Sequence, residues 1–369
     1  MGEWPTFIFL ISFKHMQTIA LSDYNIYVGP IETGWQSFLA QKKYGQILVI
    51  ADENTAQHCL PRLTAALGNQ NYLLIKIPPG EQHKHIGTCQ EIWQQMLDAG
   101  LDRRALVINL GGGVIGDMGG FCASTYKRGV DFVQVPTTLL SQVDASIGGK
   151  LGIDFGMVKN SIGVFCNPQA VFVDPAFLTT LSAREIRSGF AEIIKHGLIQ
   201  DVEQWDKIKN ISDLNGVNWA ELIVPSLLIK KHVVEEDPFE RGLRKALNYG
   251  HTIGHAVEGF ALETDRPLLH GEAIAIGMIT EAWLSQQQGY LSSEDLAEIS
   301  VFFIKTYGHY ALSEENFSAY LRLMGNDKKN EGQKINFSLI GAPGQVHINC
   351  HAEAPEIMAS LRYYQQLSH

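Results

Sequence analysis

Five polar residues between positions 244 and 258 recur at a spacing that could build one wall of a site. Arg244, Asn248, His251, His255 and Glu258 follow one another at steps of 4, 3, 4 and 3 residues, so on an α-helix they would share one face. The residues between them are largely apolar, and such a polar row is costly to bury without partners. The row predicts a ligand site, with a surface or structural pair of histidines as the alternative.

Two further segments could complete a metal site with this row. Glu192 and Lys195 stand three residues apart in AEIIKHG, and His270 opens a nearly all-apolar helical segment. Glu192, His251 and His270 would supply one carboxylate and two imidazoles, a set that suits catalytic zinc with open positions for water or substrate hydroxyls. They form no local metal motif, and HTIGH lacks the glutamate of the metalloprotease motif His-Glu-x-x-His. The fold must therefore bring the three residues together.

A glycine-rich turn follows the apolar run RALVINL. Gly111, Gly113 and Gly116 satisfy Gly-x-Gly-x-x-Gly ahead of a predicted helix. Missing Cβ atoms would let backbone amides approach a pyrophosphate, whose charge the helix N-terminus stabilises. A tight strand-to-helix turn without a ligand is the alternative. Asp52, at the end of QILVIAD, could accept both hydroxyls of a ribose or simply form a turn.

A loop-rich stretch, PTTLLSQVDASIGGKLGID, places hydroxyls, Asp144, paired glycines and Lys150 close together in the sequence. Amides and an ammonium group in such a loop are suited to holding phosphate oxygens. The stretch is not a Walker loop, because Leu151 follows the lysine and position 144 lacks the first glycine. ATP-dependent phosphoryl transfer is disfavoured.

Six short β-branched runs alternate with helical patterns over residues 24 to 180, which predicts a parallel sheet covered by helices. The expected strands are NIYVG, QILVIAD, NYLLIKIP, RALVINL, DFVQVP and AVFVD. Beyond residue 175 helical spacing dominates, as in 183–199 and 219–234. We therefore expect an α/β domain over 1–176, with 1–15 as an extension outside the core, and an all-α domain over 177–369.

Composition excludes several classes of protein. A length of 369 residues favours two domains, and the longest apolar run falls far short of a transmembrane helix. Five widely spaced cysteines form no Cys-x-x-Cys motif and suggest a reducing cytoplasm rather than a disulfide framework. The net charge of −10, without an aromatic-rich basic run, argues against nucleic acid as a partner. An anionic substrate would need cations gathered locally.

Several longer segments combine into a more specific pattern. In chain order they are GGGVIGDMGGF, PTTLLSQVDASIGGK, Lys159-Asn160, AEIIKHG, LRKALNYGHTIGHA, HGEAIAIGM and Asp327-Lys328-Lys329. Over about residues 20 to 345 the sequence resembles the 3-dehydroquinate synthase family of sugar-phosphate cyclases. The resemblance implies a Rossmann-like NAD-binding α/β domain, a helical metal- and substrate-binding domain, and a homodimer.

The resemblance also implies roles for individual positions. Metal ligands, for zinc or for cobalt or another divalent ion, would be Glu192, His251 and His270. NAD contacts would come from Asp52, Asn54, Glu81, Lys84, Gly113, Val114, Ile115, Gly116, Asp117, Thr137, Thr138, Lys150, Lys159, Phe177, Leu178, Thr179 and Thr180. Substrate contacts would come from Asp144, Lys150, Asn160, Lys195, Lys230, Arg244, Asn248 and His255, with Arg128, Lys328 and Lys329 near the phosphate.

The implied reaction converts 3-deoxy-D-arabino-heptulosonate 7-phosphate into 3-dehydroquinate and phosphate in the shikimate pathway. NAD would oxidise one alcohol transiently, phosphate would leave, the hydride would return, and ring opening and an intramolecular aldol step would close the carbocycle. Two positions depart from the family pattern Gly-Gly-Lys-Thr-Gly-x-Asn, since Leu151 and Asp154 replace the threonine and the asparagine. Pro238 and Phe239 also follow Asp237 where acidic residues are frequent in the family.

Three alternatives remain open at the level of sequence. One is a related cyclase of the 2-deoxy-scyllo-inosose or valiolone type, although Asn248 and the intact GHTIGHA favour dehydroquinate synthase. Another is a metal-dependent polyol dehydrogenase, which would accumulate NADH with product. The third is an NAD-binding regulatory module without turnover.

Overall fold

The computed structural model describes residues 16–156, 158–325 and 335–367, which fold into two compact units. The first unit comprises the described residues up to Thr137 together with Gly149–Thr180 and Asn218–Val224. The second comprises Thr138–Gly148, Leu181–Val217 and the described residues from Pro225 onward. The expected extension 1–15 lies outside the described residues, and the boundary after residue 176 stays a prediction about domains.

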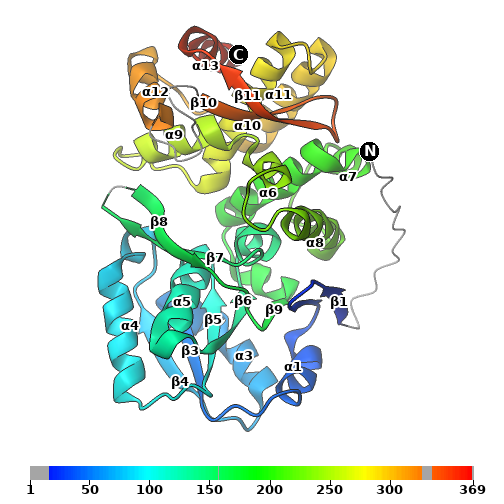
Figure 1. The fold of residues 1–369 in the computed structure, drawn as a ribbon. Coiled ribbons are helices and arrows are strands. Elements are labelled where there is room, and N and C mark those ends of the chain that lie inside the picture. Colours follow the sequence, from blue (N-terminus) through cyan, green and yellow to red (C-terminus); the bar gives the residue numbers. More distant parts are fainter. Residues whose placement is uncertain (1–15, 157, 326–334, 368–369) are drawn as a thin grey trace. The chain divides into compact units, whose positions relative to one another are not determined.

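A seven-stranded sheet forms the centre of the first unit (Figure 1). Its order is β1-β2-β9-β6-β5-β3-β4; β1 pairs antiparallel with β2, and the other neighbours pair parallel. All six runs expected to form strands do so, which confirms the α/β class, whereas β1 was not expected. The strands are β1 (Gln17–Ala20), β2 (Asn25–Val28), β3 (Ile47–Asp52), β4 (Leu73–Ile77), β5 (Leu106–Gly111), β6 (Asp131–Pro136) and β9 (Ala170–Val173).

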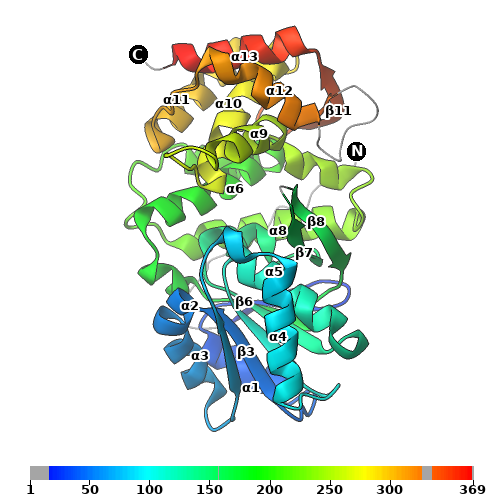
Figure 2. The same cartoon turned by 90° about the vertical axis from the view of Figure 1, so that its left-hand side faces the viewer.

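Helices cover both faces of this sheet (Figure 2). Along β3, Leu48 and Ile50 pack with α4 and α5, while Val49 and Ala51 pack with α1 and α3. A parallel strand buried on both faces needs such a continuous apolar run. The helical elements of this unit are α1 (Ile31–Leu39), α2 (Glu53–His58), α3 (Leu60–Leu67), η1 (Glu81–His83), α4 (Ile86–Asp98), α5 (Gly113–Thr125), η2 (Tyr126–Arg128) and η4 (Pro175–Thr180).

A two-stranded antiparallel hairpin, β7 (Lys150–Phe155) and β8 (Val158–Phe165), extends from the same unit. Its inner side is anchored because Leu151 and Ile153 join the apolar cluster around α4 and α5. Leu151, which replaces the family's threonine, is buried there and touches the face of α5 at Gly120. The substitution therefore supplies apolar packing between the hairpin and α5.

The second unit is mainly helical, as expected, and most of its helices have a buried face. Ser182 caps the start of α6 (Ala183–Gln200), because its side chain accepts a hydrogen bond from the Glu185 amide. The elements are η3 (Ser141–Ala145), α6 (Ala183–Gln200), α7 (Val202–Ile208), η5 (Leu243–Asn248), α9 (His251–Ala261), α10 (His270–Gln287), α11 (Ser293–Tyr307), η6 (Glu314–Asn316), α12 (Phe317–Gly325) and α13 (Ala354–Gln366). Helix α8 (Trp219–Glu236) contributes its first residues to the first unit and the rest to the second.

The expectation of an all-α second half needs one correction. Strands β10 (Ile335–Ile340) and β11 (Val346–Ala352) form an antiparallel hairpin in the second unit. Leu339 and Ile340 are fully buried, and the Ile340 amide donates to Ser285 of α10. The hairpin therefore packs on α10 as part of the core. Its short strands INFSLI and VHINCHA were not predicted, because they follow a long stretch of sequence with helical spacing.

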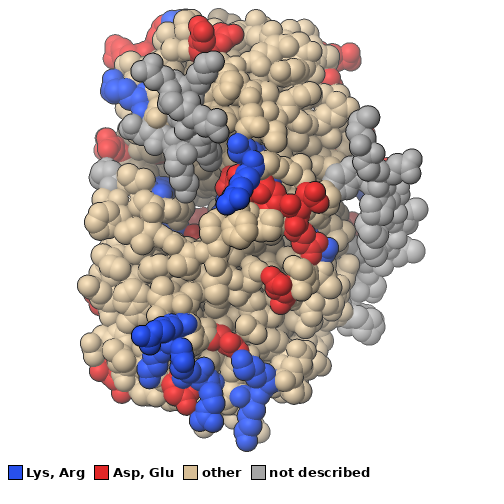
Figure 3. All heavy atoms as spheres, in the orientation of Figure 1, with Lys and Arg blue, Asp and Glu red and all other residues tan. Residues whose placement is uncertain are grey.

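No helix among the described residues is long and apolar enough to span a bilayer. On the face drawn in Figure 3, acidic and basic side chains form small groups separated by uncharged surface. Several cations are instead buried inside the second unit, among them Lys195, Lys230 and Arg244.

Candidate active site

Glu192, His251 and His270 converge in the second unit, although they lie far apart in the sequence. Glu192 lies within α6, His251 begins α9 and His270 begins α10. The Nε2 atoms of His251 and His270 lie 3.4 and 3.3 Å from Oε1 of Glu192. Two atoms that bind one tetrahedral zinc ion at about 2.1 Å are about 3.4 Å apart. The three side chains therefore already have the spacing of a shared coordination sphere.

The second nitrogen of each imidazole has its own acceptor. Nδ1 of His251 lies 3.0 Å from the Tyr249 carbonyl oxygen, and Nδ1 of His270 lies 3.4 Å from Oε2 of Glu258. A carbonyl oxygen can only accept, so Nδ1 of His251 donates to it, and Nε2 is the ring atom that remains to bind a cation when the ring is neutral. Acceptors in this position are what orients metal-binding histidines. Glu258 is thus a carboxylate behind His270, and the donor set fits a divalent cation.

The three converging side chains shift one another's pKa values. Burial lowers the pKa of His270, but hydrogen bonds with Glu192 and Glu258 outweigh it and raise this pKa to about 10. Burial, together with Lys195, lowers the pKa of His251 to about 4. Burial opposes ionisation of Glu192, yet Lys195 and His251 hold its pKa well below the usual value. An ionised carboxylate therefore faces one neutral and one cationic imidazole.

A second polar group surrounds Asp144 on the π-helical turn η3. Its Oδ1 lies 2.5 Å from Nζ of Lys230 and 3.9 Å from Nε2 of His196, while Lys195 contacts Glu192. Burial raises the pKa of Asp144, but Lys230 and Lys195 outweigh burial and lower it. Burial also lowers the pKa of Lys230. The predicted substrate residues Asp144, Lys195 and Lys230 therefore lie in one charged cluster.

The expectation that Arg244, Asn248 and the histidines share one continuous helix is wrong. Residues 243–248 form a 3-10 helix, Tyr249 leaves the helical conformation (ψ 128°), and Gly250 has φ +80° before α9 begins at His251. A Cβ on Gly250 would meet Met278 at 2.4 Å. The close approach of α10 therefore breaks the helix, and the 4, 3, 4, 3 spacing does not describe one face.

Arg244 and Asn248 nevertheless each have defined hydrogen-bond partners within the second unit. The Arg244 guanidinium is buried and donates to the carbonyl oxygens of Pro238 (2.7 Å) and Gly148 (3.2 Å). Asn248 donates to Glu240 at 2.7 Å. His255 is exposed, and its ring centre lies 5.1 Å from that of His251 and 5.8 Å from that of His270. His255 therefore borders the three converging side chains without joining them.

In the first unit, several predicted cofactor residues meet at Lys84. This buried lysine donates to Asp117 at 2.7 Å and to Asn160 at 2.6 Å, and Glu81 lies 3.8 Å away. Burial lowers the pKa of Lys84, but Asp117 and Glu81 outweigh burial and raise it. Asp154, which replaces the family's asparagine, accepts the Asn160 amide at 2.7 Å. The substitution adds a carboxylate to the surroundings of a buried ammonium group.

A second group in the first unit forms around Cys59, which sequence inspection did not single out. Asp52, Thr137 and Thr180 lie close enough to its thiol to influence the thiol's pKa. Burial and Asp52 raise the pKa of Cys59 to about 11. The Asp52 carboxylate accepts the Thr55 amide and caps α2. Asp52 therefore has a structural role that agrees with the turn-forming alternative.

The glycine turn has the predicted context, since β5 ends at Gly111 and α5 begins at Gly113. A Cβ on Gly111 would lie 2.5 Å from Ile115, which explains the need for glycine at that position. Residues Val114, Ile115, Gly116 and Asp117 form the first turns of α5. The Thr137 amide donates to the Gly111 carbonyl oxygen, so the ends of β5 and β6 are joined.

The other predicted positions have ordinary surroundings. Phe177 and Leu178 are buried in η4, Thr179 and Thr180 donate to carbonyl oxygens of the same turn, and Thr138 bonds with Ser141. Asn54, Lys150, Lys159 and Arg128 are exposed. Lys328 and Lys329 lie outside the described residues.

Two models of one protein family together match most of this chain. The family model described as 3-dehydroquinate synthase N-terminal matches residues 74–188, and the model of the C-terminal part matches residues 189–330. The 3-dehydroquinate synthase of Parabacteroides distasonis is 40% identical over 336 residues, covering 90% of this chain and 94% of the relative. The chain belongs to the 3-dehydroquinate synthase family. The Campylobacter concisus enzyme is 38% identical over 345 residues, covering 93% of this chain and 97% of the relative.

Solved structures show how widely the fold of this 3-dehydroquinate synthase family member is shared. A 2-deoxy-scyllo-inosose synthase complexed with carbaglucose-6-phosphate, NAD+ and Co2+ matches with TM-score 0.81 at 23% identity, over 95% of this chain and 99% of that chain. The 2-epi-5-epi-valiolone synthase of Streptomyces hygroscopicus, with NAD+ and Zn2+ bound, matches with TM-score 0.81 at 25% identity over the same shares. Glycerol dehydrogenase of Schizosaccharomyces pombe has TM-score 0.66 at 16% identity, over 93% and 89%. The cyclases are thus closer in fold than the dehydrogenase.

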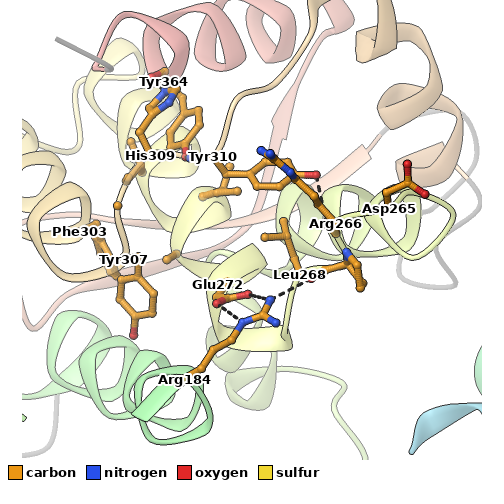
Figure 4. Close-up of a pocket in the computed structure, with 15 residues that line it drawn as sticks. Arg184, Asp265, Arg266, Leu268, Glu272, Phe303, Tyr307, His309, Tyr310 and Tyr364 are labelled. Carbon is orange, nitrogen blue, oxygen red and sulfur yellow. Dashed lines mark hydrogen bonds and ion pairs between the residues drawn. The ribbon is translucent and has the colours of Figure 1, made fainter. Parts of the chain in front are cut away.

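A pocket of about 390 Å³ lies beside the first turn of α10 in this family member (Figure 4). Arg184 of α6 reaches Glu272 with two bonds of 2.8 and 2.6 Å, and its guanidinium also donates to the Pro267 carbonyl oxygen. Glu272 caps the Leu269 amide, directly before His270. This ion pair therefore helps to fix the start of α10. The pocket's lining does not include Glu192, His251 or His270.

The surroundings of the predicted site residues could not be foreseen from the sequence. Glu258 was noted in the polar row but not as the partner of His270. His196 adjoins Lys195 in the motif AEIIKHG and gave no separate signal, yet it is fully buried beside Asp144. Contacts between distant helices identify both residues, and no spacing in the sequence records those contacts.

Proposed function

We propose that this chain is a 3-dehydroquinate synthase that converts 3-deoxy-D-arabino-heptulosonate 7-phosphate into 3-dehydroquinate and inorganic phosphate. The observation that carries the proposal is the meeting of Glu192, His251 and His270 at 3.3 to 3.4 Å in a member of this family. The proposal includes NAD, a divalent cation, a homodimer and the cytoplasm.

Glu192, His251 and His270 would hold the cation, with the Tyr249 carbonyl oxygen and Glu258 fixing the two imidazole rings. When bound, the cation would stabilise alkoxide character on a substrate hydroxyl, and NAD would accept a hydride from that carbon and later return it. The exposed His255 next to this cluster would exchange a proton with a substrate oxygen or with water.

The buried cations would bind the anionic parts of the substrate. Lys195, Lys230 and Arg244 supply ammonium and guanidinium groups in a chain whose net charge is −10. Asp144 holds Lys230 in place at 2.5 Å. Such preorganised cations orient the phosphate and carboxylate before reaction, and phosphate leaves more readily as its charge is compensated.

The residues around Lys84 and the glycine turn would bind NAD in the first unit. The first amides of α5 favour a pyrophosphate, because a helix N-terminus carries unpaired N–H groups. Lys84, fixed by Asp117 and Asn160, would add a cation close to the start of the same helix.

The proposal is tested by incubating purified protein with the heptulosonate phosphate, NAD and zinc while measuring phosphate, dehydroquinate and absorbance at 340 nm. We expect phosphate and dehydroquinate in equal amounts, with no NADH accumulating. NADH formed stoichiometrically with product would instead indicate a polyol dehydrogenase.

The alternative with specific support is a related cyclase, because the 2-deoxy-scyllo-inosose and valiolone synthases share the fold with TM-score 0.81. Their identities of 23% and 25% are well below the 40% shared with a curated dehydroquinate synthase. Glucose 6-phosphate, whose carba analogue is bound in the solved 2-deoxy-scyllo-inosose synthase, separates the possibilities in the same assay. Turnover of this sugar phosphate with no turnover of the heptulosonate phosphate would overturn the proposal.

A further inference from the structure

Helix α9 begins with a candidate metal ligand but lacks a cap from its own sequence. His251 is the first residue of α9, and the preceding Gly250 contributes no side-chain hydrogen bond. A helix leaves its first N–H groups unpaired, so these amides need another acceptor. A serine, threonine or aspartate cap is excluded at position 250, because φ is +80° and a Cβ would lie 2.4 Å from Met278.

The missing acceptor comes from another helix. Glu281 of α10 is fully buried, and its Oε2 accepts the Gly250 amide at 2.6 Å while its Oε1 accepts the Ile253 amide at 3.0 Å. The two amides flank His251 in the sequence. One carboxylate therefore holds the backbone on both sides of this ligand, and its negative charge also suits the N-terminus of α9.

Further contacts tie the same segment to α10. The Tyr249 hydroxyl donates to the Met278 carbonyl oxygen at 2.8 Å, and the Tyr249 carbonyl oxygen fixes Nδ1 of His251. Gly277 lets the helices approach, since a Cβ there would lie 1.9 Å from the Gly250 oxygen. Helix α10 also presents His270 at its own start. One helix thus carries one ligand and fixes the position of the other.

We propose that Glu281 is a positioning residue for the metal site: its carboxylate caps α9 from α10 and thereby holds His251 against Glu192 and His270. The inference rests on the proposed function, because it assigns His251 to the metal. Glu281 itself does not touch the metal position in this account, and it acts only through the backbone of residues 250–253. A substitution that removes one acceptor leaves a buried backbone N–H group without a partner, so its effect at this position is large.

The test measures zinc affinity by competition with a chromophoric chelator, together with urea unfolding of the metal-free protein. Glu281→Gln keeps the shape but offers one carbonyl oxygen to two N–H donors and turns an NH₂ group towards the other donor. We expect zinc affinity to fall about 10- to 100-fold, the usual effect of losing a supporting contact behind a metal ligand. NAD affinity is expected to stay unchanged.

Ser285→Ala is the matched control. Ser285 is also fully buried on α10, but its hydroxyl accepts the Ile340 amide of β10 and donates to the Glu281 backbone carbonyl oxygen, so Ser285→Ala leaves the Glu281 carboxylate and the amides it caps in place. We expect a lower urea midpoint with unchanged zinc affinity. Wild-type zinc affinity in Glu281→Gln, or an equal loss in Ser285→Ala, would overturn the inference.

Two further variants keep the outcome decisive. If Glu281→Gln does not fold, Glu281→Asp replaces it. Aspartate keeps both carboxylate oxygens but is shorter by one methylene, so the oxygens lie farther from the two amides. Weakened zinc binding in this variant supports the inference, and unchanged binding contradicts it. In His251→Ala, zinc binding as tight as in the wild type would overturn the proposed metal site itself. Weak binding in His251→Ala with normal binding in Glu281→Gln would overturn only the role of Glu281.

Discussion

At the scale of single residues, the site depends on polar groups that are buried only because each has a defined neighbour. Glu192 is fully buried between two imidazoles and Lys195, and the rings are turned by the Tyr249 carbonyl oxygen and Glu258. The residue types of the metal set were predictable, since carboxylate and imidazole in these motifs suggest a divalent cation. The acceptors behind the rings were not, because they come from the turn before α9 and from the end of α9.

The first prediction concerns the two histidines of GHTIGHA. In His251→Ala the metal loses a direct ligand, so zinc affinity should fall by more than the roughly 10- to 100-fold typical of supporting residues. His255→Ala is the control on the same helix, because His255 is exposed and borders the converging side chains. It should keep its zinc and lose turnover. Equal zinc affinities in the two variants would contradict this division of roles.

The second prediction concerns acid stability and His196. Both ring nitrogens of this fully buried histidine lack hydrogen-bond partners in the described structure, and burial together with Lys195 lowers its pKa to about 3. The unfolded chain, with a histidine pKa of about 6.5, binds the extra proton first, so the stability present above pH 6.5 is lost as pH falls towards 3. We expect the titration of His196 alone to lower the free energy of unfolding by about 1.4 kcal/mol for each pH unit in this window.

Urea unfolding at several pH values measures this effect in the wild type and in His196→Phe, which keeps an aromatic ring without a titratable group. The variant should lose less stability between pH 6 and 4. A pH dependence identical to that of the wild type would show that His196 does not titrate in this range.

At the scale of elements, the packing of α9 against α10 determines the positions of His251 and His270, which begin these two helices. Glycines bring the helices together: a Cβ on Gly277 would lie 1.9 Å from the Gly250 oxygen, and one on Gly254 would lie 3.1 Å from the Ala273 oxygen. The pattern of glycines was visible in GHTIGHA and HGEAIAIGM, but sequence spacing favoured one helix through residues 244–258. The real break at Gly250 depends on contact with α10, which periodicity does not record.

The third prediction follows from this crossing. Gly277→Ala should force the helices apart, costing roughly 1–3 kcal/mol or more as overpacking does, and should weaken zinc binding. Gly259→Ala on α9 is the control, because nothing lies within 4 Å of its added Cβ. This control should be neutral or slightly stabilised, by up to about 1 kcal/mol. Unfolding midpoints and zinc titrations that fail to separate the two variants would contradict the account.

At the scale of the whole molecule, the α/β class, the six expected strands and the helical second half were predictable, because buried parallel strands and apolar helices leave strong periodic signals. The hairpins β7–β8 and β10–β11 were not, since β7 begins in a glycine-containing stretch that resembles a loop and β10–β11 follow a long helical stretch. The exchange of segments between units, with 138–148 in the second and 149–180 in the first, also leaves no mark in composition.

The fourth prediction is that the cofactor sites can be disrupted separately. Lys84→Met removes the buried ammonium group that Asp117 and Asn160 hold in place. A hydrogen bond from this charged group to NAD would contribute about 1.5–3 kcal/mol to NAD binding. NAD affinity should therefore fall roughly 10- to 100-fold while zinc affinity stays at the wild-type value. Titrations of each variant with NAD and with zinc check this expectation, and wild-type NAD affinity in Lys84→Met would remove Lys84 from the proposed cofactor site.

Anomalous diffraction at the zinc edge, from crystals grown with zinc, shows directly which residues bind the metal ion. The described residues offer two other groups of possible ligands, His255 with Glu258 and His270, and Asp144 with Glu192 and His196. We expect one peak about 2.0–2.2 Å from the Nε2 atoms of His251 and His270 and from a Glu192 carboxylate oxygen. A peak on either of the other groups, with the position between Glu192, His251 and His270 empty, would contradict this expectation.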